Sequence, residues 1–248
     1  MFKKLTNKDI SAAIDKLIAY LGVKEEIPSS DFLKLLRDKN AQGCVQEIAI
    51  RLGLPIRINL SYVGKDFRAD NTNVFHTSAI AQTDWRGRGI ESITAQVSIP
   101  PNLPMFGSSG LQGYPIQVRI SESCHEHPET FVAIMAHELS HVLLASLWLP
   151  EKDSELHTDL VPIILGFREI VRRGRKIVQS TISGDTTTTQ TTTYGYLTDS
   201  QHDFVCRYVI DILKTYQSKK KSFNRIGEEI ISQASHSHKI FGKVSRIP

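Results

Sequence analysis

Hydrophobic residues recur at steps of three and four over much of the first fifty residues, which is the spacing of amphipathic helices. Three helices are predicted there, over residues 5–22, 30–37 and 42–52. Residues 55–63 (PIRINLSYV) instead alternate apolar and polar positions, the pattern of a half-buried strand. The first part of the chain, residues 1–53, is therefore expected to be helical.

The pattern is less regular between residues 64 and 113, where Pro, Gly and Asn are frequent, and we expect irregular structure there with one strand over 90–99. Residues 115–120 (PIQVRI) alternate again and predict a strand. A helix over 129–147 follows, with Pro128 at its first position. Because this helix is apolar on nearly every side, we expect it to be buried all round.

The second half of the chain continues with a helical pattern over residues 153–173. Pro162 lies inside it and should kink or restart the helix, because proline cannot donate the backbone hydrogen bond. The threonine-rich residues 176–196, with Gly-Asp near their centre, predict a β-hairpin, and a flexible low-complexity tract is the alternative. A further amphipathic helix is predicted over 199–216.

These elements predict an α+β protein with a small sheet beside the buried helix. We expect a helical N-terminal part (1–53), a core (54–216) and a basic C-terminal helix and tail (217–248). Of the 248 residues, 40% are hydrophobic and 23% charged, which excludes a disordered or fibrous chain.

Charge and cysteine content limit the environment of the protein. A net charge of +4 is too small to indicate a nucleic-acid-binding protein by itself. The most apolar stretch is interrupted by two histidines and a glutamate, which argues against a membrane span, and no apolar segment follows the N-terminal lysines as in a signal peptide. Cys44, Cys124 and Cys206 are odd in number and far apart, so we expect reduced thiols in a cytoplasmic protein.

The most informative pattern is HELSH, residues 137–141, on the buried helix. Residues four apart lie one above the other on a helix, so His137 and His141 can bind the same metal ion. Glu138 is the next residue along the helix after His137, where its carboxylate can reach a water molecule bound to that ion. This is the arrangement of zinc peptidases, in which Zn²⁺ lowers the pKa of its water to about 7 and the glutamate accepts the proton.

Chance is a poor explanation of this pattern. A shuffled chain with nine histidines and thirteen glutamates would contain it about 0.02 times. The alternative is a core helix that buries these residues without a metal. An unpaired carboxylate in such a helix costs several kcal/mol, and a metal with its water would compensate for that cost.

A catalytic zinc site takes a third protein ligand and leaves the fourth position open. Glu155, His157 and Asp159 are the candidates that follow the HELSH pattern. On a helix Glu155 and Asp159 share a face, so one carboxylate can bind zinc while the other orients a ligand histidine. His157 would point about 200° away from Glu155.

HELSH followed by Glu155 and Asp159 resembles the gluzincin class of zinc metallopeptidases. The order HELxH, ExxTDL and YGYL also resembles small uncharacterised bacterial proteins, over about residues 115–216. This resemblance implies a zincin-like core within residues 54–216 and Zn²⁺ as the cofactor. It implies zinc ligation by His137, His141 and Glu155, proton transfer by Glu138, and support of a ligand histidine by Asp159.

The expected function is a zinc-dependent endopeptidase of narrow specificity that acts on a protein or peptide. In such peptidases an extended substrate pairs with an edge strand near the site helix, and we expect residues 115–120 to be that strand. The oxyanion that develops on the substrate also needs hydrogen-bond donors. Tyr194, Tyr196 and His202 are the candidate donors.

Two other functions stay open at the level of sequence. The first alternative is a SprT/Spartan-like protease, in which His157 would be the third ligand and Lys219 to Lys221 would contact the phosphates of DNA. That lysine run is otherwise a solvated helix end. A non-catalytic zinc-binding sensor or scaffold is the second alternative, since closed structural sites have four protein ligands. The role of residues 1–110, the substrate and the oligomeric state do not follow from the sequence.

Overall fold

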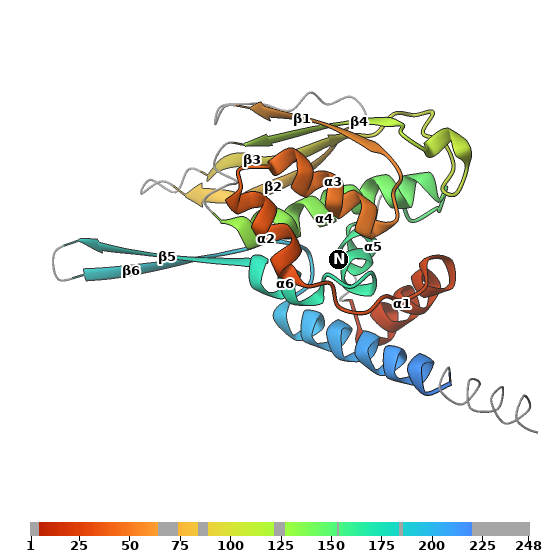
Figure 1. Ribbon diagram of the computed structural model, residues 1–248. Helices are drawn as coiled ribbons and strands as arrows, with labels where there is room; N and C mark the ends of the chain where they lie inside the picture. The colour runs from red at the N-terminus through yellow and green to blue at the C-terminus, as the bar shows by residue number, and fades with distance from the viewer. Residues whose placement is uncertain are drawn as a thin grey trace, which may run out of the picture. The chain divides into compact units, whose positions relative to one another are not determined.

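The computed structural model describes residues 5–63, 74–83, 89–121, 127–152, 154–183 and 186–219. Over 74–83, 89–94, 177–183 and 186–192 it describes the backbone alone. The chain divides into two compact units, Met1–Cys206 and Arg207–Pro248. The first unit combines helices with small sheets (Figure 1), in agreement with the α+β class expected. The helix over residues 199–219 begins in the first unit and continues into the second. Among the described residues, no helix has both the length and the apolar character that a membrane span needs.

Three helices open the chain, as predicted. They are α1 (Asn7–Leu21), α2 (Ser29–Arg37) and α3 (Ala41–Leu52). Thr6 caps α1, because its hydroxyl accepts the backbone N–H of Asp9 while the Asp9 carboxylate accepts the N–H of Thr6. Gly53 ends α3 in the left-handed conformation. Helices α2 and α3 pack against the buried HELSH helix, so the N-terminal part shares its core.

Four strands form one mixed sheet in the order β1-β4-β3-β2. They are β1 (Arg57–Val63), β2 (Val74–Thr83), β3 (Gly89–Ser98) and β4 (Pro115–Ser121). Strands β1 and β4 are parallel, and the other neighbours are antiparallel. The prediction of irregular structure with a single strand between residues 64 and 113 is therefore wrong. The second strand, β2, lacks a clean alternation because register shifts at Thr77/Ser78 and Ala79/Gln82 break the period of two.

Strand β4 lies in the interior of the sheet. Its backbone pairs with β1 on one side and with β3 on the other, and Ile116, Val118 and Ile120 are fully buried. The expectation that residues 115–120 form the edge strand is wrong, because both rows of backbone groups are already used. Strands β1 and β2 form the edges.

Two glutamines of α3 cover the β1 edge. The Gln46 amide donates to the carbonyl of Ile56 (2.8 Å) and accepts the N–H of Ile58 (3.0 Å). One turn earlier, Gln42 donates to the carbonyl of Ile58 (2.6 Å) and accepts the N–H of Leu60 (3.1 Å). The two side chains thus bind the outer backbone groups from Ile56 to Leu60 as a neighbouring strand would, and block strand addition along the first half of this edge.

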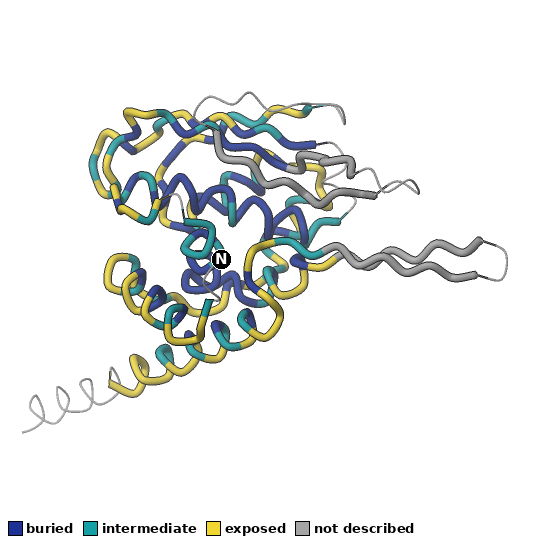
Figure 2. The backbone as a smooth tube through the Cα atoms, turned by 180° about the vertical axis from the view of Figure 1, so that it is seen from behind, coloured by how far each residue is buried: buried dark blue, intermediate teal, exposed yellow. Residues whose placement is uncertain are grey.

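Helix α4 (Pro128–Ser146) carries HELSH and forms the centre of the first unit. It packs against β2 and β3 on one side and against α2, α3, α5 and α6 on the others. In Figure 2 it is the long helix under the sheet, dark blue along most of its length. The prediction of a helix buried all round is confirmed, and the packing on both sides explains its apolar character.

Helices α5 (Glu155–Ile164) and α6 (Arg168–Gly174) follow, and the predicted interruption falls between them. Pro162 lies inside α5, and the chain turns at Gly166, whose φ is 98°. A Cβ at Gly166 would lie 2.2 Å from the Glu25 carbonyl oxygen, so the chain passes too close for a side chain.

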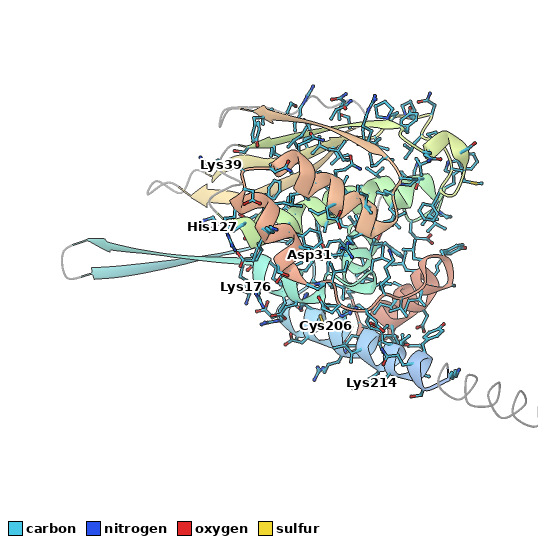
Figure 3. All side chains as sticks on the ribbon, in the orientation of Figure 1. Asp31, Lys39, His127, Lys176, Cys206 and Lys214 are labelled. Atoms are coloured by element: carbon cyan, nitrogen blue, oxygen red, sulfur yellow. The ribbon has the colours of Figure 1, made fainter. Side chains whose placement is uncertain are left out.

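Strands β5 (Lys176–Ser183) and β6 (Thr186–Thr193) pair in antiparallel register, which confirms the predicted hairpin. The predicted Gly-Asp turn, 184–185, lies outside the described residues. Figure 1 shows the two strands side by side beyond α6. Lys176 lies at the base of the hairpin (Figure 3), where its ammonium group pairs with Asp199 at 2.5 Å.

Candidate metal centre

Helix α4 presents the two histidines of HELSH on one face. The rings of His137 and His141 lie 5.2 Å apart at 81° to each other. One ligand atom from each of His137, Glu138 and His141 lies within 4.8 Å of the others. The spacing therefore brings these three side chains together, as the sequence predicted.

Helix α5 brings three more polar side chains to the same place. Glu155 Oε2 lies 3.3 Å from His137 Nε2 and 3.6 Å from His141 Nε2. Asp159 Oδ1 lies 2.8 Å from His137 Nδ1, and Thr158 Oγ1 lies 3.3 Å from His141 Nδ1. Positions i, i+3 and i+4 of a helix share one face, so each of the three α5 residues reaches a histidine of α4.

When both rings are neutral, as metal binding requires, these contacts favour a proton on Nδ1 of each histidine. A carboxylate only accepts, so His137 Nδ1 donates to Asp159. The Thr158 hydroxyl gives its single proton to the carbonyl of Ser154 (3.1 Å) and therefore accepts from His141 Nδ1. Once Nδ1 holds the proton of a neutral ring, Nε2 offers its lone pair, and both Nε2 atoms face Glu155.

Two carboxylates, Glu138 and Glu155, lie close enough to the histidines to be the third metal ligand. Zn–N and Zn–O bonds of about 2.0–2.1 Å in a tetrahedron separate neighbouring ligand atoms by about 3.3–3.4 Å. The distances from Glu155 Oε2 to His137 and His141, 3.3 and 3.6 Å, match that separation. The Glu155 carboxylate therefore has the geometry of a third ligand, with Glu138 beside it.

Buried oxygens without hydrogen-bond partners test whether the residues fit a cation. In the described part of the chain, both carboxylate oxygens of Glu138 and Oε2 of Glu155 are buried and have no such partner. Leaving buried carboxylate oxygens unsatisfied is costly. A zinc ion with a water molecule would satisfy all three, so the donor set fits this metal.

The proximity of these groups shifts their pKa values in the metal-free protein. Burial would lower the pKa of His137, but the hydrogen bond to Asp159 and the nearby Glu155 carboxylate outweigh it and raise this pKa to about 10. Burial raises the pKa of Glu138 to about 8. Burial and the neighbouring His137 lower the pKa of His141 to about 4. Without a metal, a proton on His137 therefore supplies the positive charge between the acidic groups.

Asp159 also holds the YGYL segment. Its Oδ2 accepts the backbone N–H groups of Tyr196 (2.6 Å) and Leu197 (3.1 Å). Gly195 has a φ of 87°, and a Cβ there would lie 3.1 Å from both Asp159 oxygens, so glycine suits this position. Burial raises the pKa of Asp159, but the hydrogen bonds from His137, Tyr196 and Leu197 outweigh it and lower this pKa.

The site opens to solvent on one side. The side chains of His141 and His137 are 1% and 12% exposed, whereas that of Glu155 is 33% exposed. Tyr196 is 66% exposed, and its ring lies nearly parallel (18°) to that of His137 at 6.5 Å. Solvent therefore reaches the site beside Glu155 and Tyr196.

Other predicted residues lie elsewhere. His157 Nδ1 lies 2.8 Å from the Ser154 hydroxyl, and Glu151 and Lys16 are the charges that act on it. His202 is buried with its ring 3.8 Å from Cys206 Sγ. Lys219 is exposed, and residues 220–221 lie outside the described part of the chain.

The sequence interpretation missed Thr158 and Gly195 as parts of the site. Both stand in the segments ELHTDL and YGYL that carried the family resemblance, but neither was given a role. The position of Thr158 three residues after Glu155 was a usable signal, since it places both on one helix face. The role of Gly195 depends on contact with Asp159, 36 residues earlier, which no local pattern reveals.

Comparisons with protein-family models, with curated proteins and with solved structures find no match for this chain. The functional interpretation therefore rests on the residues of the site and their geometry.

Proposed function

We propose that this protein is a zinc-dependent endopeptidase with a gluzincin-type site and a zincin-like core. The observation that carries the proposal is the position of the Glu155 carboxylate, within 3.6 Å of Nε2 of both HELSH histidines. The buried, unsatisfied oxygens of Glu138 beside this group support a catalytic rather than a packing role.

His137, His141 and Glu155 would hold the metal in this proposal. When bound, Zn²⁺ supplies a Lewis acid that polarises the substrate carbonyl and acidifies a water molecule. Asp159 and Thr158 keep the proton of each histidine on Nδ1, so that Nε2 stays available. Three protein ligands leave a position open, as catalysis requires.

Glu138 transfers the protons of the reaction. It accepts a proton from water as the water oxygen bonds to the carbonyl carbon and the π electrons move to the carbonyl oxygen. When the carbon–oxygen double bond re-forms, the C–N bond breaks and Glu138 gives the proton to the leaving amine. The carboxylate is thereby restored, and one water molecule has been consumed.

An extended substrate would pair with strand β2. This strand is the sheet edge whose residues contact α4, whereas the Gln42 and Gln46 side chains occupy the β1 edge. Main-chain pairing at β2 would place a peptide next to the helix that carries HELSH.

The proposal includes a cytoplasmic location and narrow specificity. Among the described cysteines, Cys44 and Cys206 are free thiols, which is the usual state in a reducing compartment. A broadly active protease would be harmful there, so we expect few substrates.

The test compares wild type, Glu138→Gln and the control Glu129→Gln on the same helix. We expect about one zinc per chain in all three by elemental analysis. In a screen of internally quenched peptides, Glu138→Gln should lose at least about 100-fold in kcat, as is typical for a proton-transfer group. A zinc-loaded Glu138→Gln that cleaves at the wild-type rate would exclude this mechanism. Zinc-loaded wild type that cleaves no peptide would favour a zinc-binding scaffold.

A further inference from the structure

Tyr196 is the exposed aromatic residue beside the candidate metal ligands. Its ring runs alongside that of His137, at 6.5 Å and 18°, yet two-thirds of the residue is exposed. A side chain that only fills space would be buried further at such a site. Tyr196 therefore contacts both His137 and solvent at this side of the site.

The backbone of Tyr196 is held from both sides. Asp159 Oδ2 accepts the N–H groups of Tyr196 (2.6 Å) and Leu197 (3.1 Å). On the other side, the Arg175 guanidinium donates to the Leu197 carbonyl. The carboxylate that orients His137 thus also positions Tyr196, so the ring is preorganised relative to the histidine.

The site contains several carboxylates, but an oxyanion that forms on a substrate there would need a hydrogen-bond donor. The Tyr196 ring lies alongside that of His137, and burial together with the charges of Glu155, Asp159 and Glu138 raises the pKa of its phenol. Carboxylates cannot donate to an oxyanion, whereas a phenol that is protonated at neutral pH can. We propose that the Tyr196 hydroxyl donates a hydrogen bond to the oxyanion that forms on the substrate carbonyl. This inference rests on the proposed peptidase function.

The other two candidate donors fit this role less well. His202 is 3% exposed and its ring contacts Cys206, so a substrate cannot reach it. Tyr194 precedes the segment whose N–H groups Asp159 accepts. Its own backbone N–H donates to the Arg175 carbonyl (2.7 Å) at the base of the hairpin. Tyr194 therefore offers a matched control two residues away.

The experiment compares Tyr196→Phe with Tyr194→Phe in the full-length protein. The first readout is acetohydroxamate binding to the cobalt(II)-loaded protein, followed by visible absorbance, since this anion also presents a charged oxygen beside the metal. We expect Tyr196→Phe to weaken binding about tenfold, the effect of one hydrogen bond to a charged group. The second readout is turnover of a cleaved quenched peptide, in which kcat should fall about 100- to 1,000-fold with little change in KM. Metal content and both readouts of Tyr194→Phe should match wild type.

Three results would overturn the inference. If Tyr196→Phe binds acetohydroxamate as tightly as wild type does, the donor role is excluded, even if Glu138→Gln still abolishes cleavage. A loss of metal in Tyr196→Phe, or an equal loss of function in Tyr194→Phe, would indicate a structural role. If wild type cleaves nothing, the peptidase proposal fails, and acetohydroxamate binding still tests the donor separately.

Discussion

His137 and Asp159 are joined by a hydrogen bond of 2.8 Å between Nδ1 and Oδ1, which links helix α4 to helix α5. The other oxygen of Asp159 accepts the backbone N–H of Tyr196 at 2.6 Å. One carboxylate therefore fixes both the orientation of a candidate zinc ligand and the segment that covers it. This connection makes the site sensitive to changes at Asp159 that leave the ligands themselves intact.

Replacement of Glu155 by Ala should weaken zinc binding more than about 100-fold, beyond the range typical of outer partners. His157→Ala is the matched control from the same helix, because His157 contacts Ser154 instead of the histidine pair. Competition with a chromogenic zinc chelator measures both affinities. The reverse pattern, with zinc lost in His157→Ala alone, would favour the Spartan-like alternative and call for DNA-binding assays.

Asp159→Asn keeps the size of the side chain but replaces one acceptor oxygen by an amide that donates. The amide can accept from His137 or from the N–H groups of Tyr196 and Leu197, but not from both sides. Zinc affinity should fall about 10- to 100-fold, again measured with the chelator.

The control for this substitution is Asp31→Asn, which alters an exposed ion pair with Arg51. Its zinc affinity should equal that of wild type. An Asp159→Asn protein that binds zinc as tightly as Asp31→Asn would show that the contact with His137 does not support the metal.

Gln46→Met should destabilise the fold without affecting zinc. The substitution keeps a long side chain but leaves the Ile56 carbonyl and the Ile58 N–H without their partner. We expect a loss of about 1–3 kcal/mol in the free energy of unfolding, measured by urea denaturation of the metal-free protein. Gln112→Met, at an exposed position, is the control. Equal midpoints for the two variants would contradict the proposed cover of the β1 edge.

Gly174→Ala tests the packing of α6 on α4. A Cβ at this position would lie 2.2 Å from the Glu129 carbonyl oxygen and 2.9 Å from the Ala133 Cβ, so the two helices must separate. Such overpacking costs about 1–3 kcal/mol. At Gly110 a new Cβ would meet the Pro104 Cβ at 3.4 Å, so Gly110→Ala should have a smaller effect. The melting temperatures of both variants are measured by thermal unfolding. The prediction fails if Gly174→Ala has the same melting temperature as wild type.

Much of the fold followed from local patterns. Helices α1, α3 and α4 were predicted from apolar spacing and end signals, and the β5–β6 hairpin from threonines around a turn. Strand β2 was not predicted, because its register shifts interrupt the alternation that identifies a strand. The position of β4 was predicted wrongly, since an alternating strand can lie at an edge or in the interior.

The sequence by itself determined which residues of α4 can share one ion, because four-residue spacing on a helix is a local property. It also determined that Glu155 and Asp159 share a face of the next helix. Only the tertiary structure brought Glu155, rather than His157, to the histidine pair, since the packing of α5 on α4 selects the face that meets it. Contacts between distant segments, such as Asp159 with Tyr196, depend on that packing and have no local trace in the sequence.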